Sequence, residues 1–155
     1  AFGGAFLEPG VKVMLPVEYM FDYKNYVASG DAHRAKYFYH AKKFPLDNQT
    51  YMDLTVLPER DNFRSIFATA MNIAHGEAEL INTAKNMKII MRWDKSTFPH
   101  LWYWLENTKD LYTLAIEPST TFLPDLENSL REGMMITMAP KSVKETWISI
   151  SVLSI

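Results

Sequence analysis

The sequence contains no cysteine. Disulfide bridges, thiolate nucleophiles and cysteine-based metal sites are therefore excluded. It also lacks an apolar run of about 18 residues, the length that a membrane-spanning helix needs. The first residues, Ala1-Phe2-Gly3-Gly4, show neither the charged start nor the apolar core of a signal peptide. We therefore predict a cytoplasmic protein that does not act at a membrane.

Neither sign of charge predominates in the sequence. The chain has 16 basic and 18 acidic residues, a formal net charge of −2, and no long block of like charges. No overall electrostatic field therefore favours nucleic acid. The four histidines lack metal-ligand spacing, no carboxylate cluster resembles a calcium loop, and no glycine-rich nucleotide motif occurs. The sequence predicts no metal, no cofactor and no nucleic-acid partner.

Apolar residues make up 48% of the 155 positions and aromatic residues 14%, so a folded core is expected. A chain of this length suits one domain, and no linker or internal repeat divides residues 1–155. Short apolar segments recur between turn residues, a pattern that favours an antiparallel β-sandwich. The expected strands are Val11–Leu15, Val17–Asp22, Arg34–His40, Met52–Leu57, Arg64–Ala70, Glu77–Ile81, Met87–Trp93, Leu101–Leu105, Leu111–Ile116, Met134–Met138 and Thr146–Leu153. At most one short helix is expected, at Pro124–Arg131, because Gly133 follows it.

The segment between residues 87 and 121 carries the candidate chemistry. In an extended strand His100, Trp102 and Trp104 point to one face. The next strand ends at Glu117-Pro118, which would place a carboxylate at a strand end beside two indoles. Indole rings pack on the apolar faces of sugar rings, and a carboxylate can accept sugar hydroxyls or act as a general base.

These residues also allow a plainer interpretation. Paired tryptophans on a strand are commonly core residues, and a glutamate before proline is commonly a solvated turn. We nevertheless predict that Trp102, Trp104 and His100 bind substrate. Arg92 is added because it could reach a sugar hydroxyl from the preceding strand.

The order of residues in "FPHLWYWLEN…LYTLAIEPSTT" resembles that of the aldose 1-epimerase (galactose mutarotase-like) superfamily. The segment Leu130-Arg131-Glu132-Gly133, the last strand from Thr146, and the opening Ala1-Phe2-Gly3 resemble the family's C-terminal portion as well. The resemblance implies a partial galactose mutarotase-like sandwich with a free sugar as its ligand. It also implies that Glu117 is the general base on the anomeric hydroxyl, without a cofactor.

By the same resemblance, the acid histidine of the family lies just before Ala1, and His100 does not match it. The chain is then the C-terminal portion of a longer protein, or a natural short form. Either should expose apolar surface, which favours a homodimer or association with the missing N-terminal portion. A non-catalytic carbohydrate-binding module and a structural β-domain without a ligand are the alternative functions. The kind of sugar, phosphorylated or not, stays open.

Overall fold

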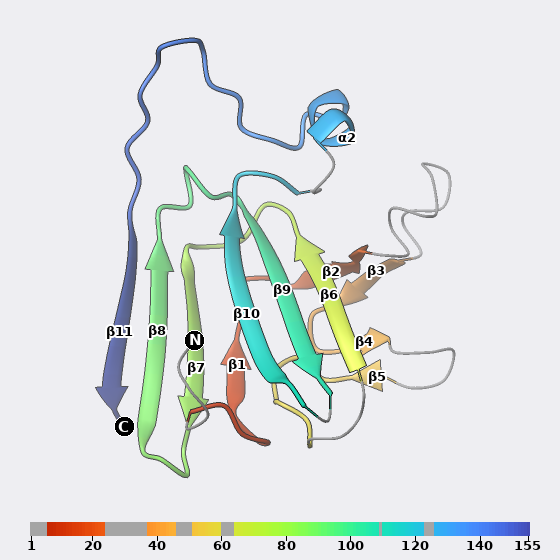
Figure 1. The fold of residues 1–155 in the computed structure, drawn as a ribbon, viewed down its shortest axis with the longest axis vertical. Coiled ribbons are helices and arrows are strands. Elements are labelled where there is room, and N and C mark those ends of the chain that lie inside the picture. The colour runs from red at the N-terminus through yellow and green to blue at the C-terminus, as the bar shows by residue number, and fades with distance from the viewer. Residues whose placement is uncertain (1–5, 24–36, 46–50, 60–63, 109, 123–125) are drawn as a thin grey trace.

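Two antiparallel sheets form the body of the fold (Figure 1). The computed structural model describes residues 6–23, 37–45, 51–59, 64–108, 110–122 and 126–155. The first sheet has the order β1 (Lys12–Met14), β7 (Glu77–Asn82), β8 (Met87–Trp93) and β11 (Ile148–Ser154). The second has the order β10 (Tyr112–Ser119), β9 (His100–Asn107), β6 (Arg64–Ala70), β2 (Tyr19–Asp22) and β3 (Phe38–His40). A ribbon of β4 (Phe44–Pro45) and β5 (Tyr51–Met52) and the helix α2 (Leu126–Arg131) complete the described elements.

The hydrophobic core lies between the two sheets. Its main cluster joins Val13 of the first sheet to Ile66, Tyr103 and Leu105 of the second, all of them almost fully buried. Because successive side chains of a strand point to opposite faces, every second residue of these strands packs in the core. A second cluster closes one end of the sandwich around Trp93, which is 2% exposed.

Most of the expected strands are confirmed, and the antiparallel sandwich with them. The expected strand Met134–Met138 is wrong: Met135 makes only an isolated bridge to Thr121. The segment Met52–Leu57 contributes a strand only at Tyr51–Met52. Its far end is held by a bridge between Val56 and Lys12. Residues 34–36 of the expected strand Arg34–His40 lie outside the described residues.

The expected end of a strand at Glu117-Pro118 is also wrong. β10 continues to Ser119, and Pro118 pairs with Leu101. β10 is the outermost strand of its sheet among the described elements. An outermost strand tolerates proline because a backbone N–H that faces away from the sheet has no ladder partner to lose. Glu117 is therefore held inside a strand, not in a turn.

β11 is the outermost strand of the other sheet and carries exposed apolar side chains. Ile148, Ile150 and Val152 pair with Trp93, Met91 and Ile89, so they share the core-facing side of the sheet. They are nonetheless 48%, 56% and 52% exposed. The predicted association with another chain or segment stays a prediction. None of the described helices is long and apolar enough to cross a membrane.

The Tyr103 hydroxyl gives a direct test of this packing. The side chain is fully buried in the core, and its hydroxyl has no hydrogen-bond partner among the described residues. Burial raises the pKa of the phenol well above its usual value. Tyr103→Phe removes an unsatisfied polar group and should raise the free energy of unfolding by about 1 kcal/mol in urea denaturation. Tyr112→Phe is the matched control. It removes the 2.7 Å hydrogen bond to the Pro58 carbonyl and should lower that free energy by about 1 kcal/mol. Destabilisation by Tyr103→Phe would contradict the packing described.

Candidate functional site

Glu117 lies on the face of the five-stranded sheet that points away from the core. It pairs with Trp102 of β9, which in turn pairs with Thr69 of β6. Directly opposite residues of an antiparallel pair project to the same side, so these three side chains share one face. Leu101, on the other side of β9, enters the core. We call the side that carries Glu117 the outer face.

The carboxylate of Glu117 is exposed. Among the described residues it makes no hydrogen bond and no ion pair, so both oxygens are available to a ligand. Its diagonal neighbour Trp104 is half-buried and pairs with Ala115 and Phe67. An open carboxylate and a partly open indole thus lie next to each other, as the sequence indicated.

Trp102 is placed differently from the expectation. It is 5% exposed, and its indole N–H donates a 3.0 Å hydrogen bond to the Thr121 carbonyl. Its ring packs against Phe67 and Tyr23, with centroid distances of 4.9 and 5.3 Å. A ring enclosed in this way has no free face for a sugar. Trp102 supports the surface on which Glu117 lies, because its burial holds the neighbouring side chains in place.

His100 shares the outer face but is also covered. It pairs with Ser119, is 8% exposed, and its ring lies 6.1 Å from that of Phe122. Within the part of the chain that the structure describes, its Nδ1 has no hydrogen-bond partner. Burial lowers the pKa of the imidazole, because an apolar environment disfavours the charged form. His100 is therefore an enclosed side chain whose burial favours the neutral form.

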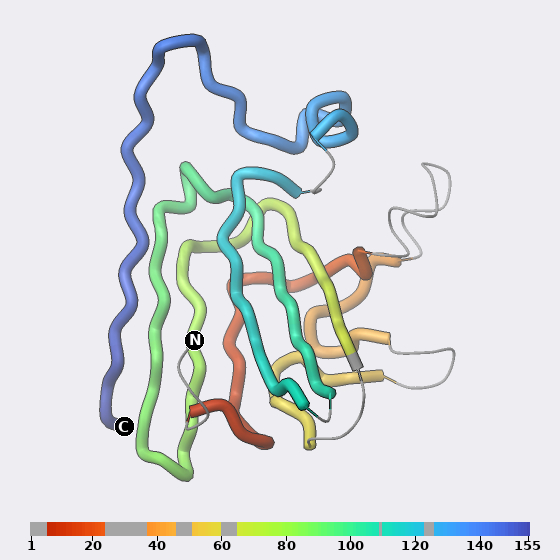
Figure 2. The backbone as a smooth tube through the Cα atoms, viewed as in Figure 1, coloured from red at the N-terminus to blue at the C-terminus, as the bar shows by residue number. Residues whose placement is uncertain are grey.

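The cover over Trp102 and His100 comes from the chain that follows β10, because Thr121 contacts Trp102 and Phe122 contacts His100. Figure 2 shows the chain bending away at this end of β10. We call residues 120–122 and 134–136 the covering segment. Its two parts are joined by hydrogen bonds from the Phe122 N–H to the Met134 carbonyl and from the Ile136 N–H to the Thr120 carbonyl, both 3.0 Å. The Thr69 hydroxyl donates a 3.1 Å hydrogen bond to the Phe122 carbonyl. The covering segment is thereby fastened across β9 onto β6.

Arg92 is not brought to this face. It lies on β8 of the other sheet, where its guanidinium pairs with the carboxylate of Glu77 on β7. The residues that the structure brings together on the outer face are Glu117, Trp104, Trp102 and His100. No group of three or more His, Cys, Asp or Glu side chains within the described ranges lies close enough together to hold a metal ion.

Residues 2–152 match the family described as a domain of unknown function, DUF4432. The chain belongs to the DUF4432 family. A search among curated proteins finds no match.

Two solved structures share the fold of this DUF4432 chain. One is the Slr1438 protein of Synechocystis sp. PCC 6803, with 18% identity and a TM-score of 0.61. The matched region covers 95% of this chain and 40% of the Slr1438 chain. The other is from Klebsiella pneumoniae subsp. pneumoniae MGH 78578 and is provisionally named an aldose 1-epimerase. It has 16% identity and a TM-score of 0.64, and the matched region covers 99% of this chain and 36% of the Klebsiella chain. At these identities the likeness establishes the fold. This DUF4432 chain spans well under half the length of either protein.

Sequence reasoning missed the covering segment and the residues that fasten it. Thr69 and Phe122 are 53 positions apart, and neither stands in a motif. Phe122 follows a run of serine and threonine, which reads as a loop. Only the apolar character of Phe122 hinted that this part of the DUF4432 chain packs against something. Because a single hydroxyl–carbonyl contact leaves no periodic pattern, the pairing could not be found without coordinates.

The buried imidazole predicts a dependence of stability on pH. Because the pKa of His100 is lowered in the folded protein, the unfolded chain binds a proton below about pH 6.5 that the folded chain does not. The free energy of unfolding should fall as the pH drops from about 7.5 to 5.5, with at most about 1.4 kcal/mol per pH unit due to this group. His100→Leu should flatten the profile by that share in denaturant titrations. His75→Leu, at an exposed loop position, should leave the profile unchanged. Identical slopes for wild type and His100→Leu would contradict the assignment.

Proposed function

We propose that this chain is part of an aldose 1-epimerase-like enzyme that interconverts the anomers of a sugar, with Glu117 as general base. The observation that carries the proposal is the exposed carboxylate of Glu117, which has no partner among the described residues and lies in a regular strand beside the partly open ring of Trp104. The shared fold with a protein provisionally named an aldose 1-epimerase supports it.

The proposed reaction moves two protons and breaks one bond. Glu117 takes the proton of the anomeric hydroxyl as the bond between the anomeric carbon and the ring oxygen breaks, and an acid gives a proton to that ring oxygen. The aldehyde then turns over. The same groups act in reverse to close the ring, so no atom is lost or gained. Trp104 would hold the sugar by contact with its apolar face.

The general acid is proposed to come from outside residues 1–155. His100 shares the outer face, but it is buried beneath Phe122 with Nδ1 enclosed. By the resemblance in sequence, the proposed acid is a histidine just upstream of Ala1. A catalytic pair would then form only when the rest of the protein lies against β10.

Hydrolysis of a glycosidic bond is disfavoured by the spacing of carboxylates. It needs two carboxyl groups about 5–9.5 Å apart. On the outer face of β9 and β10 the other carboxylate belongs to Glu106, which pairs with Thr113. Thr113 is four residues from Glu117, a separation of roughly 13 Å along the strand. These two side chains therefore lie too far apart to flank one bond.

Glu117→Gln tests the proposal in the full-length protein. With freshly dissolved α-glucose or α-galactose, the rate of mutarotation followed by polarimetry should fall at least about 100-fold, because the amide cannot accept the proton. Glu106→Gln, on the same face, is the matched control and should keep the wild-type rate. Equal rates for Glu117→Gln and wild type would exclude Glu117 as the base.

A non-catalytic carbohydrate-binding module is the second candidate. It is favoured by the lack of an open histidine beside Glu117 among the described residues. The module predicts sugar-dependent quenching of tryptophan fluorescence, lost in Trp104→Ala, without any acceleration of mutarotation by the full-length protein. A fast wild-type reaction would exclude it.

A further inference from the structure

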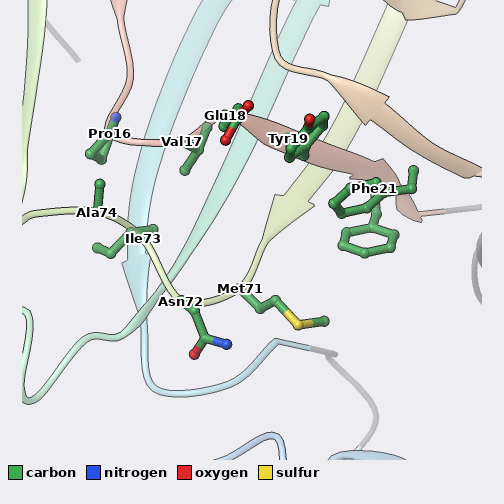
Figure 3. A pocket seen from close by; sticks show the side chains of 10 residues that line it. Pro16, Val17, Glu18, Tyr19, Phe21, Met71, Asn72, Ile73 and Ala74 are labelled. Atoms are coloured by element: carbon green, nitrogen blue, oxygen red, sulfur yellow. The ribbon is translucent and has the colours of Figure 1, made fainter.

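A cavity of about 330 Å³ opens between the start of β2 and residues 71–74, which follow β6 (Figure 3). The two walls are joined at their base by a 2.8 Å hydrogen bond from the Ala74 N–H to the Pro16 carbonyl. Its volume is at the lower end of the roughly 300–1,000 Å³ found for ligand pockets. A single sugar ring is a ligand of suitable size.

Three aromatic rings form one wall of the cavity. Phe38 stacks on Tyr19 with ring centroids 4.5 Å apart and also contacts Phe21, at 4.6 Å. Tyr19 is 39% exposed and Phe38 43% exposed, although both lie in paired strands. Tyr19 and Phe38 are stacked with their planes 28° apart, and Phe21 is tilted by 58° to Phe38. The three rings thus form one continuous aromatic surface, which we call the platform, and they do not form a cage of ring faces around a bound cation.

The polar groups of the cavity are hydrogen-bond acceptors and amides. Glu18 is exposed, and it raises the pKa of the Tyr19 phenol by its negative charge and by accepting a hydrogen bond from the Tyr19 hydroxyl. Asn72 stands on the opposite wall in the left-handed region, with φ of 52°, and its exposed amide has no hydrogen-bond partner among the described residues. None of the described residues that line the cavity is a lysine, arginine or histidine. Among them a phosphate or a carboxylate would find no counter-charge, whereas sugar hydroxyls would find both donors and acceptors.

The cavity is separate from Glu117, although it lies on the same face. The register runs from Glu117 through Trp102 and Thr69 to Phe21, which is three strand spacings or about 14 Å. Phe122 stands between them: it is bonded to Thr69, and its ring lies 5.3 Å from that of Phe21. A sugar held at Glu117 would not reach the Tyr19–Phe38 platform.

We propose that this cavity binds an uncharged pyranose unit and is a second sugar site of the protein. The choice of sugar as the ligand class rests partly on the function proposed above. The site itself rests on the aromatic platform, on the acceptor and amide groups, and on a described lining that holds no basic residue.

The test is a titration of the isotopically labelled full chain with methyl β-glucopyranoside and methyl β-galactopyranoside, followed by amide NMR. These glycosides cannot open their rings, so turnover at Glu117 cannot interfere. Saturable shifts are expected for the amides of residues 17–19 and 72–74. Phe38→Ala should weaken the binding at least about tenfold, since it removes the centre of the platform. Glu18→Gln, an exposed substitution that keeps the shape, should weaken it several-fold.

Tyr51→Ala is the control, because this exposed tyrosine of β5 does not line the cavity. It should bind the glycosides as the wild type does. Glu117→Gln should also bind them as the wild type does. Binding in the cavity can therefore be tested independently of whether Glu117 is a catalytic base. The proposal is overturned if both glycosides leave residues 17–19 and 72–74 unshifted, or if the shifts survive in Phe38→Ala and Glu18→Gln. It is also overturned if tetramethylammonium shifts these amides and the glycosides do not.

Discussion

The alternation of side chains along β9 is the constraint on which the rest of the structure depends. β9 pairs with β10 on one side and β6 on the other, over eight and seven residues respectively. Leu101, Tyr103 and Leu105 enter the core, while His100, Trp102 and Trp104 face outward. A slip of one residue would exchange the two sets, which ties the position of the outer-face groups to the burial of the core.

The outer face is divided by the covering segment. Phe122 closes over Thr69 and His100, and the Thr121 carbonyl takes the Trp102 indole N–H. These contacts leave two open regions on the same sheet: Glu117 with Trp104 on one side, and the Tyr19–Phe38 platform on the other. Aromatic residues that look equivalent in the sequence therefore have different roles. Trp102 is enclosed by rings and a hydrogen bond, whereas Trp104 keeps part of its surface open.

One side of the five-stranded sheet stabilises the fold, and the other side carries the residues of the proposed function. The core side holds the sandwich together through buried apolar contacts. The outer side contributes the polar groups, and Glu117 lies on the outermost described strand of its sheet. Such a position is sensitive to whatever lies against β10. In the two solved structures that share the fold, much more polypeptide is present than in this chain, and their likeness extends to the fold alone.

The amino-acid sequence determined the class of fold. Period-two apolar segments and their turns predicted most strands, the short helix before Gly133, and the pairing of a Glu117 strand with the strand of two indoles. It determined these because alternation and turn chemistry are local properties of the chain. Only the tertiary structure decided that β10 runs through Pro118, that Trp102 and His100 are covered by Phe122, and that Arg92 pairs with Glu77 on the other sheet. Burial depends on which distant segment packs over a side chain, and no local pattern carries that information.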